Sequence, residues 1–172
     1  MAMKLIGTAS LPSGNTSGST GLTITGIPQT YKDLLIIASL RTPRAGEQDG
    51  VGFALNENSS TYAYIGIHWN GGVTNQNTNY ESMWAGAMHA SANAASLYNN
   101  HEIYIPNYTN SLNKSYIQNS VANSSISSNA SQLSMTANVY TTNTNAVTSF
   151  RLQSATANGL TQYSAVWVYG IN

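Results

Sequence analysis

Residues 31–41 read YKDLLIIASLR and form the most hydrophobic segment of the chain. Four bulky apolar residues stand in a row at positions 34–37, and Pro28 and Pro43 flank the run, which leaves little length for a helix. The two isoleucines at its centre are β-branched and favour the extended state. A short apolar run of this kind predicts a strand buried on both faces, or nearly so. We expect the remaining strands to pack over it.

The composition also favours β-structure. Hydrophobic residues make up 41% of the 172 residues, which is too many for a disordered chain. Only 7% of the residues are charged, against roughly 25% in an average soluble protein. Serine, threonine and asparagine must therefore form much of the polar surface, and these residues disfavour helix interiors but suit strands and turns. The composition predicts an all-β protein.

Charge, cysteine content and hydropathy exclude several classes of partner and site. The formal net charge is zero, so there is no electrostatic basis for binding nucleic acid or an anionic membrane. Cysteine is absent, which excludes disulfides and thiolate metal sites. No stretch approaches the length of a membrane span, and residues 1–14 lack the apolar core of a signal peptide. We expect a protein made in a cytoplasm that binds neither nucleic acid nor membrane.

Alternating apolar and polar residues predict further strands along the chain. These strands cover residues 21–27, 51–56, 62–69, 101–105, 114–122, 133–140, 146–152 and 163–171, with 81–90 assigned to strand and helix as its alternative. Loops are expected at 12–21, 42–50, 70–80 and 123–131, a helical turn at 92–97 and a hairpin connection at 141–145. About nine or ten short strands are typical of a two-sheet antiparallel β-sandwich, with a jelly roll as the favoured topology.

The N-terminal residues are expected to differ from the rest of the chain. Residues 4–11 could form a short first strand or an arm that reaches onto a neighbouring molecule. They are followed by PSGNTSGSTG, a stretch rich in Gly, Ser and Thr that is typical of a flexible connection. We therefore divide the chain into a flexible N-terminal arm or first strand at 1–20 and one β-sandwich domain at 21–172.

Three groups of residues together resemble the shared sequence pattern of a protein family. The first group is a Tyr-x-Asp-Leu strand followed by serine and arginine, and the second is an extended segment that ends in Pro-Asn-Tyr and leads to a lysine. The third is an aromatic-Gly-Ile end. In this chain the groups are Tyr31, Asp33, Leu34, Ser39 and Arg41, then Ile103, Ile105, Pro106, Asn107, Tyr108 and Lys114, then Tyr169, Gly170 and Ile171. In their order and spacing they resemble a loosely related group of tailed-bacteriophage virion proteins, from which the chain departs at Ala165-Val166-Trp167.

The resemblance implies a β-sandwich structural protein without catalytic residues. From it we expect a capsid decoration (cement) protein that binds the major capsid protein on the capsid exterior, as a homo-oligomer and by preference a trimer, made in a bacterial host. The alternative is a tail-fibre module that recognises a glycan on the host surface. A fold by itself does not determine function, so both hypotheses depend on the family resemblance.

Acidic residues offer weak candidates for catalysis or calcium binding. A glycosidase needs two carboxylates that converge on one sugar bond, and no pair among the six is indicated by its spacing. Asp33 is expected to pair with Arg41 or Lys114, or to cap a turn. Glu47 and Asp49 could bind Ca²⁺, but a solvated loop is the favoured interpretation. The six carboxylates are Asp33, Glu47, Asp49, Glu57, Glu81 and Glu102.

The three histidines are candidates for a zinc site, and the sequence signal for this site is as weak as that of the acidic residues. His68, His89 and His101 lie on three separate expected strands, without the short spacing that zinc sites use. Ordinary hydrogen-bonded histidines are therefore the favoured interpretation. We predict no catalytic residue, no metal ligand and no cofactor.

Aromatic residues are the more informative candidates. Trp69, Tyr80 and Trp84 flank the expected loop at 70–80, and a second set, consisting of Tyr104, Tyr108 and Tyr116, brackets the turn at 106–113. Exposed aromatics beside asparagine-rich loops suit sugar binding by stacking, and they suit a protein interface equally well. Burial in the core is the competing interpretation for each of them. The predicted interface residues are Leu5, Ile6, Leu11, Trp69, Tyr80, Trp84 and Tyr108.

Overall fold

A computed structural model of the chain describes residues 2–14, 21–57, 62–69, 73–80, 83–122, 132–140 and 144–172; for 62–69, 73–80 and 83–85 it describes the backbone alone. The described residues form twelve β-strands and no helix. None of the described segments is a helix long and apolar enough to cross a membrane. The strands are β1 (Met3–Ser10), β2 (Leu22–Thr25), β3 (Asp33–Leu40), β4 (Gln48–Leu55), β5 (Tyr62–Trp69), β6 (Val73–Tyr80), β7 (Met83–His89), β8 (Asn99–Ile105), β9 (Lys114–Ala122), β10 (Gln132–Tyr140), β11 (Ser149–Ser154) and β12 (Ala165–Ile171).

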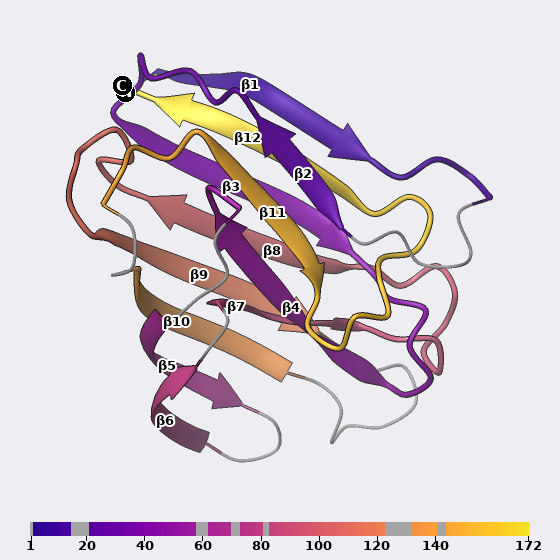
Figure 1. Ribbon diagram of the computed structural model, residues 1–172. Helices are drawn as coiled ribbons and strands as arrows, with labels where there is room; N and C mark the ends of the chain where they lie inside the picture. The colour runs from indigo at the N-terminus through magenta and orange to yellow at the C-terminus, as the bar shows by residue number, and fades with distance from the viewer. Residues whose placement is uncertain are drawn as a thin grey trace.

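The strands form two antiparallel sheets that pack as layers (Figure 1). The larger sheet has eight strands in the order β1-β12-β3-β8-β9-β10-β5-β6, and the smaller has four in the order β2-β11-β4-β7. The expected all-β, two-sheet antiparallel architecture is confirmed. The jelly-roll topology stays a prediction.

Several local expectations were wrong. The strand count exceeds the expected nine or ten because β1 forms a full strand and β6 occupies residues 73–80, where a loop was expected. Residues 92–97 form turns and no helix. The connection at 141–145 cannot close a hairpin, because β10 lies in the large sheet and β11 in the small one. Residues 42–50 are not a solvated loop either, since β4 begins at Gln48 and Asp49 is buried.

Strand β3, which contains the apolar run at positions 34–37, lies inside the large sheet between β12 and β8 (Figure 1). Its burial alternates: Leu34, Ile36 and Leu40 are fully buried, whereas Leu35 and Ile37 are only half-buried. The expectation of burial on both faces therefore needs correction. The small sheet covers one face of β3, and the other face belongs to the outside of the large sheet.

The hydrophobic core lies between the two sheets. The inward side chains of β3, β8 and β12 face those of β2, β4 and β11 in one continuous cluster. At its centre the ring of Phe53 meets Tyr116 edge-on at 5.4 Å between centroids and Phe150 at 6.0 Å. Aromatic pairs in this geometry add stabilisation beyond the burial of their area.

Strand β1 is the first strand of the large sheet, and among the described strands it pairs with β12 alone. The register shifts between Leu5 and Gly7, which marks a bulge in β1. The strand alternative for residues 4–11 is thus the observed one. Because β1 has a neighbour on one side only, the main-chain groups of its other side are not used by the sheet.

Candidate functional site

The residues that carry the family resemblance stabilise the ends of β3 and β8. The carboxylate of Asp33 accepts hydrogen bonds from the Tyr104 hydroxyl at 2.7 Å and from the Asn107 main-chain nitrogen at 2.8 Å. Tyr108 is fully buried and its hydroxyl donates to the carbonyl oxygen of Pro28. Of the partners expected for Asp33, the turn is confirmed. Tyr108 belongs to the core, so its prediction as an interface residue was wrong.

Lys114 is a buried cation that binds main-chain carbonyls. Its side chain is 1% exposed. The ammonium group donates to carbonyl oxygens in the two neighbouring turns, those of Asn110, Leu112 and Thr144. Burial lowers the pKa of Lys114. The lysine therefore joins the turn before β9 to the segment after β10, a structural role.

Arg41 has the corresponding position at the other end of β3. Its guanidinium donates to three carbonyl oxygens of one loop, those of Asn93 at 3.0 Å, Ala94 at 2.7 Å and Leu97 at 3.1 Å. Burial lowers the pKa of Arg41. The planar, multidentate group suits this arrangement, because it can reach several carbonyls of a turn at once.

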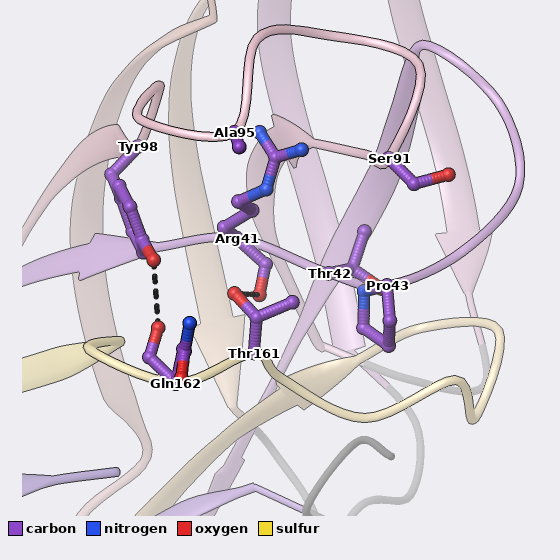
Figure 2. A pocket seen from close by; sticks show the side chains of 8 residues that line it. All are labelled: Arg41, Thr42, Pro43, Ser91, Ala95, Tyr98, Thr161 and Gln162. Carbon is purple, nitrogen blue, oxygen red and sulfur yellow. Dashed lines mark hydrogen bonds between the residues drawn. The ribbon is translucent and has the colours of Figure 1, made fainter. Parts of the chain in front are cut away.

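A cavity of about 220 Å³ lies beside Arg41 (Figure 2). In Figure 2 the Tyr98 ring forms one wall, and its hydroxyl donates to the Gln162 carbonyl at 2.7 Å. The guanidinium of Arg41 already binds three carbonyls. None of the lining residues, which are Arg41, Thr42, Pro43, Ser91, Ala95, Tyr98, Thr161 and Gln162, has a carboxylate, thiol or imidazole. The hydroxyls of Ser91 and Tyr98 in the lining therefore have no carboxylate or imidazole of that lining beside them to act as a general base.

The described acidic residues do not converge on a common point. Asp49 is buried and accepts hydrogen bonds from the hydroxyls of Ser154 at 2.6 Å and Thr156 at 2.8 Å. Glu57 makes a surface ion pair with Arg151 at 3.6 Å. Among the residues with described side chains, no three acidic or histidine residues are grouped as a metal site would require.

Two of the three histidines have described side chains, and both are buried. His89 on β7 and His101 on β8 are each 2% exposed. The pKa of His89 is lowered, first by burial and second by the charge of Arg41, its neighbour in an isolated parallel bridge. The side chain of His68 lies outside the described part. His89 is thus a neutral core residue at ordinary pH.

The aromatics expected around one loop belong to different parts of the sheets. Trp69 pairs with Val73 at one end of the β5–β6 hairpin, and Tyr80 pairs with Tyr62 at the other end. At about 3.3 Å per residue these ends are roughly 20 Å apart. Trp84 lies on β7 in the small sheet, opposite Gly52. The backbone therefore does not assemble the three residues into one sugar-stacking platform; their side chains lie outside the described part.

The most unusual feature is on β9 and β10. Their outward side chains include five large apolar residues, which we call the β9–β10 patch: Ile117, Val121, Leu133, Met135 and Val139. Each is between 40% and 55% exposed. The antiparallel register sets Leu133 directly opposite Val121, so the apolar residues of the two strands lie side by side. The sequence shows this alternation, but it cannot tell which face points outward.

Between Tyr116 and Tyr140, which belong to the core, the inward side of the same strands is polar. Gln118, Ser134, Thr136 and Asn138 are all buried. Thr136 donates to the Gln118 side-chain oxygen at 3.1 Å, and Asn138 donates to Thr136 at 2.7 Å. This strand pair therefore inverts the usual arrangement, in which apolar residues point inward and polar residues outward.

Apolar side chains continue across the rest of the large sheet. On the side of the β9–β10 patch, which we call the outer face, the next strands contribute half-buried residues: Tyr104 on β8, Leu35 and Ile37 on β3, and Trp167 and Tyr169 on β12. Glu102 is the one exposed charge on the outer side of strands β3, β8, β9, β10 and β12. At the edge, Met3 and Leu5 of β1 are 56% and 48% exposed.

The remaining predicted interface residues lie in or beside β1. Leu5 is exposed, whereas Ile6 and Leu11 are partly buried and pack against the core. No family model matches this chain, and no curated protein matches it. The phage relationship therefore stays a prediction from the sequence.

Proposed function

We propose that this chain is a non-enzymatic structural protein of a virion. In this proposal it decorates the exterior of a phage capsid, binds the major capsid protein and assembles as a homo-oligomer. It would act through binding alone: the free energy of its contacts would hold neighbouring shell subunits together. The family resemblance of the β3 and β8 motifs supports the choice of a virion.

The observation that carries the proposal is the apolar outer face of the large sheet. Soluble monomers rarely expose large contiguous apolar patches, and those that do commonly use them for association. The five residues of the β9–β10 patch lie on two adjacent strands and are all substantially exposed. A chain with this face, a net charge of zero and few charged residues suits a permanent assembly better than free solution.

The edge strand β1 is the part of the molecule that we propose for contact with the shell. Its outer edge has no partner strand within the described chain, so it can accept a strand of another protein by β-augmentation. Met3 and Leu5 add exposed apolar side chains at the same edge. These residues belong to the N-terminal segment for which a first strand or an arm is expected from the sequence.

The test is cosedimentation of the purified protein with capsids of its own phage that lack it. We expect saturable binding at a fixed ratio per capsid and better survival of the loaded shells on heating. A Met3→Asp/Leu5→Asp variant should bind at least tenfold more weakly, because its edge would carry two charges. Leu112→Asp is the matched control, since Leu112 is 66% exposed in the turn before β9.

Two outcomes would contradict the proposal. Absence of binding to shells would remove the decoration role, and adherence of the protein to host cells or their polysaccharide would favour the tail-fibre module instead. Equal binding by the wild type and the Met3→Asp/Leu5→Asp variant would exclude β1 as the shell contact.

A further inference from the structure

The β9–β10 patch needs a partner that accepts an uncharged, apolar sheet surface. Its five members are Ile117, Val121, Leu133, Met135 and Val139, and the outward residues between them on the two strands are serine, asparagine and alanine. The inward residues of the same strands already hydrogen-bond one another beneath the patch. These hydrogen bonds, together with Tyr116 and Tyr140 in the core, hold the strand pair in this orientation, so the patch stays exposed unless a partner covers it from outside.

The charge distribution favours a second copy of this chain as the partner that covers the patch. Specific partners of another kind are usually selected by complementary charge, and this surface offers almost none. A neutral apolar surface can pack on its own copy without like-charge repulsion. The interfaces of permanent homo-oligomers are also more apolar than those of transient complexes.

The size of the outer face agrees with this choice. Strands β12, β3, β8, β9 and β10 are adjacent and contain seven to nine residues each. With about 4.8 Å between strands and about 3.3 Å per residue, they present a surface of roughly 600 Å². A stable interface needs about 800 Å² of accessible surface from each partner, a value of the same order.

We propose that the outer face, with the β9–β10 patch as its most exposed part, is the contact through which copies of this chain assemble. This inference deepens the proposed function and rests on it, because it names the surface that joins the copies of the decoration protein. It assigns different contacts to the two exposed regions: β1 binds the shell, and the β9–β10 patch binds another copy of the chain. Sheets that pack face to face lie about 10 Å apart, so the side chains of the two patches would interdigitate.

The mass of the protein in solution, without any shell, tests the inference. By sedimentation equilibrium the wild type should have a multiple of the 18.3 kDa chain mass. Ile117→Lys should lower the mass to that of one chain, because assembly would have to remove the water around an ammonium group within the apolar patch. Leu112→Lys should leave the mass unchanged, since that exposed residue lies outside the patch. A monomeric wild type, or an oligomer that Ile117→Lys leaves intact, would overturn the inference.

Two further measurements keep the test independent of folding defects and of shell binding. The double variant Ile117→Thr/Met135→Thr retains strand-compatible side chains and removes apolar area, so it should also be monomeric, with an unchanged far-ultraviolet circular dichroism spectrum. Because the chain has no cysteine, Ile117→Cys should form disulfide-linked dimers on oxidation and Leu112→Cys should not. An Ile117→Lys protein that stays oligomeric but loses shell binding would assign the patch to the capsid and overturn the inference while sparing the proposed function.

Discussion

The hydroxyl of Tyr104 donates a hydrogen bond to Oδ2 of Asp33 at 2.7 Å, which joins the neighbouring strands β8 and β3 at one end of the large sheet. The second carboxylate oxygen accepts the main-chain nitrogen of Asn107, so one aspartate fixes both a strand pair and the turn that follows it. Asp33 and Asn107 belong to the motifs that carry the family resemblance. Their role in the structure is to hold the fold together.

Replacing Tyr104 by phenylalanine should lower the free energy of unfolding by about 1 kcal/mol, because it removes one hydrogen bond at a half-buried site. Urea denaturation measures this as a lower midpoint with an unchanged m-value. In an Asp33→Ala background the same substitution should cost little. A full loss in both backgrounds would show that the hydroxyl does not act through Asp33.

Because of the Tyr104–Asp33 pair, we expect the stability of the fold to depend on pH in the alkaline range. The hydrogen bond to Asp33, and then burial, raise the pKa of Tyr104 above its ordinary value of 10.0. The unfolded chain therefore loses this proton first, and the stability contributed below pH 10 is lost as the pH rises through the raised pKa of the folded state. The difference in stability between the wild type and Tyr104→Phe should shrink in this range. A constant difference would contradict the assignment.

Gly86 on β7 is expected to tolerate no side chain. Its φ is +92°, and a Cβ atom would lie 1.9 Å from the Ser120 hydroxyl oxygen on β9. Gly86→Ala should therefore cost about 3 kcal/mol or more, from strain and overpacking together. Gly26→Ala is the matched control, because φ is +68° there and nothing lies within 4 Å of the added atom. It should cost only about 1 kcal/mol, from strain alone; equal losses of melting temperature would contradict the close approach of β7 and β9.

Arg41 and Arg151 allow the same Arg→Lys substitution to be compared at two positions with different partners. Arg41→Lys should destabilise the protein by about 2 kcal/mol, since two separate nitrogens of the guanidinium bind these three carbonyls and the ammonium group of a lysine has only one nitrogen to replace both. Arg151→Lys should change the stability by less than about 0.5 kcal/mol, because its partner Glu57 is exposed. Chemical denaturation measures both. Hydrogen exchange in the loop at 91–98 should accelerate only in the Arg41 variant, and uniform exchange across the chain would argue against a local role.

Because of His89, we expect the stability of the fold to depend on pH in the acidic range. Burial, and then the charge of Arg41, lower its pKa below the ordinary value of 6.5. The unfolded chain therefore binds the proton first, and stability that is present above pH 6.5 is lost as the pH falls through the lowered pKa of the folded state. His89→Gln should reduce this loss. Denaturation midpoints of both proteins between neutral and acidic pH provide the measurement, and parallel curves would exclude His89 as the cause.

The architecture was predictable because it depends on local patterns. The apolar run at 31–41 and the period-two alternations identified most strands, and the low helix propensity of a chain rich in Ser, Thr and Asn identified the class. Strand β6 escaped prediction because its residues, VTNQNTNY, have a loop-like composition, and pairing with β5 organises them as a strand. The buried state of Tyr108 also escaped, since a tyrosine beside a polar turn suits the surface and the core equally well.

By itself the sequence determined the all-β class and the positions of most strands, because these follow from composition and from the spacing of apolar residues. Only the tertiary structure decided which face of each strand points inward. An alternating strand such as β10 can direct either set of side chains to the core, and its pairing with β9 in the large sheet turns the apolar set outward. The candidate interaction surface arises from that choice, which depends on contacts between residues far apart in the chain.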